Sequence, residues 1–213
     1  MSGGRLLILG ASGHGKVVGD CAMAAAWAEI CYFDDRWPML SACGQWLVVG
    51  RGEAFFAETG AGGQAFVAIG NAATRLAWLR RLKADGISVA TVIHPCSVIS
   101  PHALIGEGGL VVAGAVVNID AKLGLGCIIN TSATVDHDCV LGDGVHVCPG
   151  AHLAGDVQVG ESSWLGIGCV VRQGIRIGVG VTVGAGAVVV ADVPDGLTVV
   201  GVPARPQEKK NER

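Results

Sequence analysis

His137 is the residue of this chain whose neighbours best prepare it to move a proton. It lies in the segment Thr134-Val-Asp-His-Asp-Cys139, between Asp136 and Asp138. A carboxylate beside an imidazole fixes the tautomer of the ring and raises its basicity, which suits a general base. The sequence leaves open which of the two aspartates is the partner.

A second group of candidate residues lies in the first ninety residues. The segment Gly10-Ala-Ser-Gly-His-Gly-Lys16 is a glycine-rich turn that leads into a helix, where backbone N–H groups can bind phosphate. Asp34-Asp35 can accept hydrogen bonds from a ribose or a base, and Gly70-Asn71 follows the next strand. The turn reads G-x-x-G-x-G rather than the dinucleotide pattern G-x-G-x-x-G, and the region is short. We therefore expect a mononucleotide rather than NAD, with a simple tight turn and a solvated acidic loop as the structural alternatives.

The larger framework that must position these residues is a six-residue repeat. Isoleucine, leucine or valine occupies every sixth position from Ile99 to Val189, sixteen times in all. A hexapeptide period indicates a β-helix, because one hexapeptide cannot bury its inward face alone and must stack. The position two before each branched residue is usually small. Gly, Asp or Asn often follows it, as at Gly106, Gly124 and Gly142, and we predict that these following residues form the tight turns.

The repeat also predicts what surrounds His137. If three hexapeptides close one triangular coil of 18 residues, Ile119 lies one layer below His137 and Gly155 one layer above. A glycine at that place leaves space and an exposed N–H beside the imidazole. It predicts room for a reacting carbonyl and its oxyanion. The alternative is that His137 is only a polar residue at a corner of the coil.

The spacing of the histidines argues against a metal centre. Hexapeptide β-helices can hold zinc with three histidines from different subunits, and an H-x4-H pair is typical of that site. Here His137, His146 and His152 are separated by nine and six residues. We therefore expect no metal.

Residues 1–90 lack the repeat and alternate strand with helix. The expected strands are residues 5–9, 30–33, 65–69 and 87–92, and the expected helices are residues 17–27, 53–58 and 72–84. This alternation predicts a small parallel α/β sheet, which binds ligands at the carboxyl ends of its strands. His94-Pro95 marks the boundary. We divide the chain into an α/β domain (1–92), a β-helix (93–205) and an exposed tail (206–213).

Composition narrows the partners. The formal net charge of −3 gives no reason to expect nucleic acid or an anionic membrane. No apolar run approaches the 18 or more residues of a membrane span, and no signal pattern is present at the N-terminus. The eight cysteines form no C-x-x-C pair, and Cys127, Cys139 and Cys169 occupy the small inward positions of the repeat. We expect reduced packing residues and a cytoplasmic protein.

Five segments, in combination and in order, resemble one family. They are Gly10-Ala-Ser-Gly-His-Gly-Lys16-Val-Val, Ala68-Ile-Gly-Asn71 with Arg75, Ile93-His-Pro95, Ile128-Ile-Asn-Thr-Ser-Ala-Thr-Val-Asp-His-Asp-Cys139 and Gly201-Val-Pro-Ala204. Over nearly its whole length the chain resembles the nucleotide-sugar acetyltransferases of the left-handed β-helix superfamily. The nearest group holds sialic acid O-acetyltransferases and bacillosamine or perosamine N-acetyltransferases. The resemblance implies a Rossmann-like α/β domain, then a left-handed parallel β-helix of hexapeptide repeats, and a homotrimer with active sites between subunits.

The resemblance also implies roles for single residues. His137 matches the family's general base and Asp138 its carboxylate partner, although Asp136 is equally near in sequence. Residues that match the acetyl-CoA site are Asn130, His146, Gly155, Gly166, Gly184, Ala185, Pro203 and Arg205. Residues that fall at the nucleotide-sugar loops are Gly13, His14, Lys16, Asp34, Asp35, Asn71 and Arg75.

The activity implied by this resemblance is acetyl transfer. Acetyl-CoA is the expected donor, and the expected acceptor is the amino group of a UDP-, GDP- or dTDP-linked 4-amino-4,6-dideoxy sugar. The product would serve bacterial surface glycan synthesis, such as lipopolysaccharide O-antigen, or glycoprotein synthesis. Two alternatives stay open: O-acetylation of a sialic acid or related sugar, and a non-catalytic scaffold that binds sugar nucleotides. Serine acetyltransferase is disfavoured because the N-terminal part of that family is helical.

Overall fold

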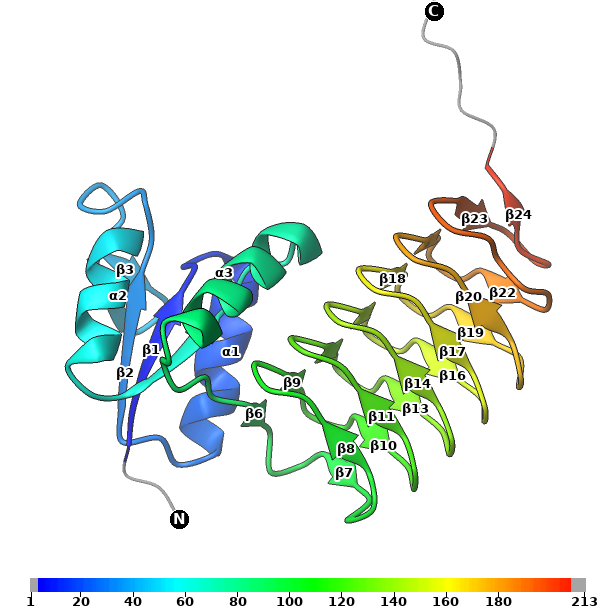
Figure 1. The fold of residues 1–213 in the computed structure, drawn as a ribbon, viewed down its shortest axis with the longest axis horizontal. Coiled ribbons are helices and arrows are strands. Elements are labelled where there is room, and N and C mark those ends of the chain that lie inside the picture. Colours follow the sequence, from blue (N-terminus) through cyan, green and yellow to red (C-terminus); the bar gives the residue numbers. More distant parts are fainter. Residues whose placement is uncertain (1–3, 208–213) are drawn as a thin grey trace, which may run out of the picture.

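The computed structural model describes residues 4–207 and divides them into an α/β domain followed by a β-helix (Figure 1). The α/β domain contains the strands β1 Arg5–Leu9, β2 Glu29–Phe33, β3 Ala42–Cys43, β4 Trp46–Gly50 and β5 Gln64–Val67. Its helices are α1 Gly13–Ala24, α2 Gly52–Gly60 and α3 Ala72–Ala84. The predicted first three strands and the three helices are confirmed, with shifts of a few residues at their ends.

The five strands form one sheet in the order β3-β4-β2-β1-β5. The strands β4, β2, β1 and β5 are parallel, and β3 pairs antiparallel with β4. The β3–β4 hairpin was not expected from the sequence. Because β1 is central and its two neighbours β2 and β5 follow it on opposite sides, the chain reverses its winding direction at the carboxyl end of β1.

Helices cover both faces of this sheet. On one face Val18 and Cys21 of α1 pack against Leu6 and Ile8 of β1 in a single buried cluster. On the other face Phe55 of α2 and the leucines Leu76, Leu79 and Leu82 of α3 pack against Leu7 and Leu9 of β1. Alternate residues of β1 therefore serve opposite faces, as the two-residue period of a strand requires.

The predicted fourth strand at residues 87–92 is only partly present. Val89 forms a single parallel bridge with Ala65, and the Ala90 N–H donates to the Ala65 carbonyl over 2.8 Å. The chain then leaves the sheet, and β6 (Val92–Ile93) pairs with the first coil instead. Val92 was predicted to belong to the α/β domain, but it pairs with Leu110 of the β-helix.

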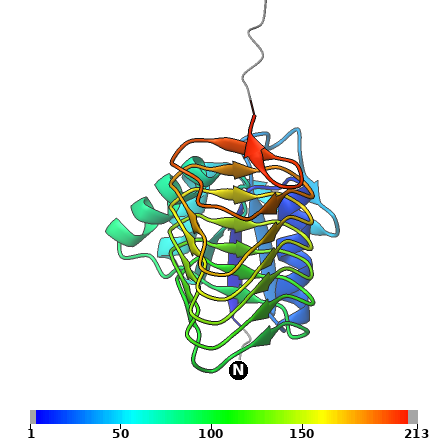
Figure 2. The ribbon, with the colours of Figure 1, turned by 90° about the vertical axis from the view of Figure 1, so that its right-hand side faces the viewer.

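Residues 92–206 wind into stacked coils with three flat faces (Figures 1 and 2). The strands are β6 Val92–Ile93, β7 Val98–Ile99, β8 Leu104–Ile105, β9 Leu110–Val111, β10 Val116–Val117, β11 Lys122–Leu123, β12 Ile128–Ile129, β13 Thr134–Val135, β14 Val140–Leu141, β15 His146–Val147, β16 His152–Leu153, β17 Gln158–Val159, β18 Trp164–Leu165, β19 Val170–Val171, β20 Arg176–Ile177, β21 Thr182–Val183, β22 Val188–Val189, β23 Thr198–Val200 and β24 Arg205–Pro206. The coil of 18 residues is confirmed, because Val117 pairs with Val135 and Val135 with Leu153. The predicted tail starts inside β24, and residues 208–213 lie outside the described part.

The three faces are sheets that we name after their first strands. The β7 sheet has the order β22-β19-β16-β13-β10-β7, the β8 sheet β20-β17-β14-β11-β8, and the β6 sheet β24-β23-β21-β18-β15-β12-β9-β6. Every repeat residue from Val111 to Val189 is at most 5% exposed, so the branched side chains fill the lumen as predicted. Cys127, Cys139 and Cys169 are also buried there, and all eight cysteines are free thiols.

The prediction for the turns is wrong in its position. The left-handed backbone does not fall on the residue after each branched residue but two residues later, where φ lies between 55° and 72°. These corner residues are Gly108, Gly114, Asp120, Gly126, Ser132, Asp138, Gly144, Gly150, Asp156, Ser162, Gly168, Gly174, Gly180 and Gly186. The earlier glycines serve close stacking instead, since a methyl group on Gly106 would lie 2.5 Å from the Gly124 carbonyl oxygen of the next coil.

Candidate active site

His137 lies in the corner that follows β13, where the coil turns from the β7 sheet to the β8 sheet. We call this corner line the His137 edge; Ile119, His137 and Gly155 stack along it. Asp138 is the left-handed residue of the corner, with φ 60°. Aspartate tolerates this conformation better than most side chains, and it folds the carboxylate back onto the preceding residue. The distance between His137 Nδ1 and Asp138 Oδ2 is 2.8 Å.

Asp136 has a different task. Its Oδ1 accepts one hydrogen bond from the backbone N–H of His137 over 2.8 Å and another from Asn118 Nδ2 over 2.8 Å. The bond from the His137 N–H lowers the pKa of the Asp136 carboxyl. Asp136 therefore holds the turn, and Asp138 is the carboxylate paired with the imidazole.

The electrostatics of the pair favour proton uptake. The hydrogen bond to Asp138 raises the pKa of His137, helped by the negative charges of Asp136, Asp138 and Asp156. With Nδ1 directed to Asp138, the neutral ring presents Nε2 as its acceptor. The His137 side chain is 56% exposed, so this nitrogen is open to a substrate.

Gly155 lies against the ring from the coil above, as predicted. A methyl group at this position would lie 2.5 Å from His137 Nε2, so any side chain would displace the imidazole. Within residues 4–207 the Gly155 N–H donates to no backbone or side-chain acceptor. An unpaired donor beside a general base can stabilise developing negative charge on an oxygen.

Cys139 follows Asp138 but points into the lumen. It is 0% exposed, and its thiol donates to the Ala154 carbonyl over 3.2 Å. Burial raises the pKa of this thiol, which disfavours the thiolate that a nucleophile needs.

His146 and Asn130 lie on another part of the coil. His146 is on β15 in the β6 sheet, 5% exposed, with its Nε2 3.1 Å from Asn130 Nδ2. Its ring centroid is 4.2 Å from that of Trp164 and 6.3 Å from that of His14 on α1. Burial lowers the pKa of His146 to about 3, so the ring is neutral. Within one chain, the structure does not bring this pair together with His137.

The residues expected to bind the pantetheine arm share one line. Asn130, Gly166 and Gly184 each follow a strand of the β6 sheet, at positions one or two coils apart; we call this line the Asn130 edge. A methyl group on Gly166 would lie 2.8 Å from the Ala185 nitrogen, so these glycines stack directly on each other. Arg205 belongs to the last strand, β24, and its Nη1 donates to the Ala204 carbonyl. Pro203 lies just before this strand, at the same end of the coil stack.

A pocket of about 250 Å³ opens at the carboxyl ends of β1, β2 and β5. Its lining comprises Leu9, Gly10, Ser12, Asp34, Asp35, Ala68, Ile69, Gly70 and Trp78. The three loops singled out in the sequence therefore meet at the point where the winding of the sheet reverses. Ser12 was included only as part of the glycine-rich segment, and Trp78 was not predicted; a tryptophan on a helix that starts at a candidate loop is a weak signal in the sequence.

Of the predicted polar residues, Asp34 and Asp35 line this pocket, whereas Asn71 follows the lining residue Gly70. Asp34 accepts from the Ala11 N–H and from Arg36, whose guanidinium holds the pKa of the Asp34 carboxyl well below its usual range. Asp35 accepts from the Gly52 N–H over 3.2 Å. Asn71 caps α3 by accepting from the Thr74 N–H over 2.9 Å.

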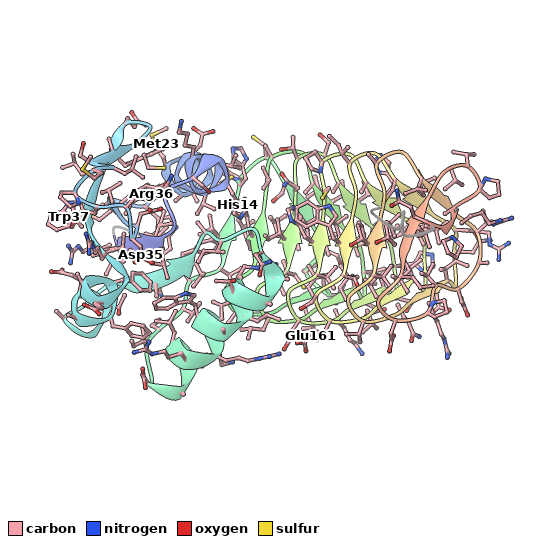
Figure 3. The ribbon with its side chains drawn as sticks, turned by 90° about the horizontal axis from the view of Figure 1, so that it is seen from above. His14, Met23, Asp35, Arg36, Trp37 and Glu161 are labelled. Atoms are coloured by element: carbon pink, nitrogen blue, oxygen red, sulfur yellow. The ribbon has the colours of Figure 1, made fainter. Side chains whose placement is uncertain are left out.

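Three more predicted residues lie on α1, just behind the glycine-rich turn. Gly13 and Lys16 are exposed on its first turns. His14 faces the coil, as Figure 3 shows, and its Nε2 is buried without a hydrogen-bond partner among the described residues. Burial lowers the pKa of His14 to about 4, so this ring is also neutral.

Arg75 lies elsewhere than expected. It is 1% exposed and does not line the pocket. Its guanidinium donates to four backbone carbonyls, two in the loop after β5 and two in the β-helix. Burial lowers its pKa to about 10, which leaves it protonated at neutral pH.

The sequence profile of the PglD N-terminal domain family matches residues 5–82. Over the whole chain, the structure is similar to the acetyltransferase domain of PglB from Neisseria gonorrhoeae FA1090 in complex with acetyl coenzyme A. The TM-score is 0.92 at 43% identity, covering 95% of this chain and 98% of that one. The chain belongs to the nucleotide-sugar N-acetyltransferases of the hexapeptide-repeat superfamily.

Other solved structures are similar over nearly the same length. PerB from Caulobacter crescentus, in complex with CoA and GDP-perosamine, has a TM-score of 0.91 at 40% identity and covers 96% of this chain and 98% of its own. WeeI from Acinetobacter baumannii AYE has a TM-score of 0.86 at 29% identity and covers 97% and 100%. The resemblance read from the sequence motifs is confirmed by these matches.

Two further observations concern what the described residues lack. No group of three or more His, Cys, Asp and Glu side chains within residues 4–207 is placed to hold a metal ion. Over the same range, no helix has the length and apolar character needed to cross a membrane.

Proposed function

We propose that this protein transfers the acetyl group of acetyl-CoA to the amino group of a nucleotide-linked 4-amino-4,6-dideoxy sugar. The observation that carries the proposal is the His137 corner: an exposed imidazole with Nδ1 held by Asp138 at 2.8 Å and Nε2 beside Gly155. The full-length similarity to enzymes solved with acetyl-CoA, or with CoA and GDP-perosamine, supports it.

In the proposed reaction His137 Nε2 accepts the proton of the amine as the amine attacks the thioester carbonyl carbon. A C–N bond forms, and negative charge develops on the carbonyl oxygen, where the Gly155 N–H can donate. The intermediate then collapses, the C–S bond breaks, and CoA leaves with the proton that His137 had taken. Asp138 keeps the imidazole oriented and stabilises its protonated form.

The two substrates would reach this corner from different parts of the molecule. The pocket at β1, β2 and β5 would hold the nucleotide, with Asp34 and Asp35 toward the ribose or base. The Asn130 edge would take the pantetheine arm, and Pro203 and Arg205 would lie over CoA.

We further propose a homotrimer, because His137 follows a strand of the β7 sheet, whereas His146 lies on and Asn130 directly after strands of the β6 sheet of the same chain. In a trimer one subunit's His137 edge can face the next subunit's Asn130 edge, so that the site is completed between them. Eight free thiols and the use of acetyl-CoA favour the cytoplasm, and surface glycan synthesis, including lipopolysaccharide O-antigen, is the corresponding pathway class.

The test is release of free CoA thiol from acetyl-CoA against a panel of UDP-, GDP- and dTDP-linked 4-amino-4,6-dideoxy sugars, with sialic acid as a further acceptor. We expect release with at least one nucleotide amino sugar and an N-acetylated product by mass spectrometry. Release with sialic acid alone would favour O-acetylation, and release with none of them would overturn the proposal.

Asp138→Asn is predicted to move the pH profile. His137 must be unprotonated to act as a base, so kcat/KM rises as pH rises through its pKa. Asp138 raises that pKa, so its removal shifts the acid limb to lower pH, while the plateau falls because the ring loses its orientation. Asparagine keeps the left-handed corner at φ 60°. Profiles of kcat/KM over about pH 5 to 9 test this, and an unmoved acid limb would contradict the assigned pair.

Cys139→Ala is predicted to leave catalysis almost unchanged. The thiol is buried in the lumen, and among the described residues its one hydrogen-bond partner is the Ala154 carbonyl, so the loss should be on the order of 1 kcal/mol in the free energy of unfolding. We expect kcat/KM within about twofold of wild type. A loss of 100-fold or more in a folded variant would instead implicate the thiol in the reaction.

A further inference from the structure

Helix α3 lies along the third corner line of the β-helix, where the chain turns from the β8 sheet to the β6 sheet. We call this line the α3 edge; its left-handed residues are Gly108, Gly126, Gly144, Ser162 and Gly180. Leu79 packs over Gly108 and Gly126, and Leu76 packs over Gly144. In Figure 3 a side chain from α3 extends toward Glu161 on the same line.

The glycines under α3 are needed for more than their backbone conformation. A methyl group on Gly144 would lie 2.8 Å from Leu76 Cδ1, and one on Gly108 would lie 2.7 Å from Leu79 Cδ2. Gly180 has the same left-handed conformation two coils further along the edge, beyond α3, and a methyl group there would meet nothing within 4 Å. The edge therefore contains both a contacted glycine and a matched free one.

Arg75, which is buried between α3 and the β-helix, also bonds the two domains to each other. Its Nε donates to the Gly126 carbonyl over 2.9 Å, and its Nη2 donates to the Gly144 carbonyl over 2.8 Å. Its Nη1 donates to the Ile69 and Gly70 carbonyls, each over 2.8 Å. Buried charged groups are usually paired with an opposite charge. Here the cost of removing the guanidinium from water is offset by hydrogen bonds to neutral carbonyls alone.

The two carbonyls that Arg75 bonds in the α/β domain belong to residues of the candidate nucleotide-sugar pocket. Ile69 and Gly70 line the pocket at the ends of β1, β2 and β5. One guanidinium thus bonds the wall of that pocket to two successive coils. Outside it, Arg80 pairs with Glu161 over 3.0 Å and Lys83 with Glu107 over 2.6 Å, and these exposed pairs add little rigidity of their own.

We propose that Arg75 and the three glycines under α3, Gly108, Gly126 and Gly144, are positioning elements that hold the nucleotide-sugar pocket at a fixed place on the coil stack. This inference rests on the proposed function. The pocket and the catalytic corner lie in different domains, so the sugar amine reaches the thioester only if the two domains keep one relative position. Displacement by about 1 Å can cost on the order of 100-fold in rate.

The test compares Gly144→Ala with Gly180→Ala. Both carry the same backbone strain at a left-handed position, and only the first pushes on Leu76. We expect Gly144→Ala to lower kcat at least tenfold relative to Gly180→Ala. Binding of CoA, and of UDP, GDP or dTDP, should stay within about threefold of wild type by titration calorimetry, because each site is intact by itself. Equal kcat values in the two variants would overturn the proposal.

A second pair of variants tests the arginine. Arg75→Met removes all four hydrogen bonds, and Arg75→Lys keeps the charge with fewer donors. Arg80→Met removes two exposed ion pairs of the same helix, to Asp143 and Glu161, and serves as the control. We expect kcat to fall at least tenfold in Arg75→Met, to recover partly in Arg75→Lys, and to stay within about twofold in Arg80→Met. A loss of nucleotide and CoA binding in parallel with kcat would show a general folding defect and overturn the positioning role.

Amide hydrogen exchange makes the test independent of the reaction. If wild type releases no thiol with any acceptor, the proposed function fails. The exchange comparison then still decides whether α3 depends on this contact. We expect faster exchange in α3 and in residues 69–71 of Gly144→Ala than of Gly180→Ala, and equal exchange would contradict the positioning role.

Discussion

Replacing His137 with alanine is expected to lower kcat/KM by at least about 100-fold while the protein stays folded, since general base catalysis typically contributes 10²–10⁴. The side chain is exposed, and its only side-chain hydrogen-bond partner within residues 4–207 is Asp138, so its removal leaves no cavity in the core. The measurement is thiol release under saturating acetyl-CoA with varied acceptor. Thermal unfolding and size-exclusion chromatography monitor the fold and the oligomer.

His102→Ala is the matched control. His102 is an exposed histidine on the same His137 edge, two coils nearer the α/β domain, and it lacks an acidic partner among its hydrogen bonds in residues 4–207. We expect its kcat/KM to stay within about twofold of wild type. If His137→Ala behaved like His102→Ala, the base would have to be sought elsewhere, with solvent as the first candidate.

Gly155→Ala is expected to have an effect of similar size from a single added methyl group. That group would lie 2.5 Å from His137 Nε2, so the imidazole must leave the position in which it faces the substrate. The methyl would also crowd the N–H proposed to donate to the oxyanion, and loss of one such donor costs on the order of 10²–10³ in kcat. Gly155 does not have a left-handed backbone, so alanine brings little strain of its own.

The double variant His137→Ala/Gly155→Ala separates the two causes. If the methyl acts mainly by displacing the ring, it adds little to His137→Ala, and the two losses are strongly non-additive. If the N–H of Gly155 contributes by itself, a further loss remains in the double variant. Wild-type rates in Gly155→Ala would show that this contact does not bear on the chemistry.

The β-helix could be predicted from the sequence because the six-residue repeat directly reflects how the side chains pack in the lumen. Each sixth residue must fill the lumen, so the period specifies the coil length, and the coil length places Gly155 against His137. The same reasoning failed at the turns. The residue after Ile105 is a glycine for reasons of stacking, whereas the left-handed conformation falls at Gly108. Both requirements select glycine, so composition does not separate them.

Side-chain direction was the main quantity that the sequence could not supply. Asp136 and Asp138 are equally near His137 along the chain, and only the left-handed backbone at Asp138 turns its carboxylate toward Nδ1. Arg75 lay in a motif next to a ligand loop. Its side chain is buried between the domains because two of the four carbonyls that it bonds belong to coils 51 and 69 residues later. Such long-range partners leave no trace in local pattern.

The α/β domain was predicted in outline and missed at its margins. Strands β1, β2 and β5 are short apolar runs between clear helices, so they were found. The segment 87–92 has the composition of a strand, but its last residues pair with the first coil, because that edge would otherwise be uncovered.

The three corner lines of the coil differ in what they contact. The His137 edge is proposed to contact the reacting groups and the Asn130 edge acetyl-CoA, whereas the α3 edge packs against helix α3 of the α/β domain. The chain visits them in rotation, six residues apart. Insertion or deletion of a whole coil of 18 residues would keep each residue on its own corner line and would change only its position along the coil axis. Insertion or deletion of six or twelve residues would instead move every later residue to a different corner line. Chimaeras that exchange the α/β domain between relatives should therefore carry Gly108, Gly126 and Gly144 with it, because α3 of that domain packs against these coil residues.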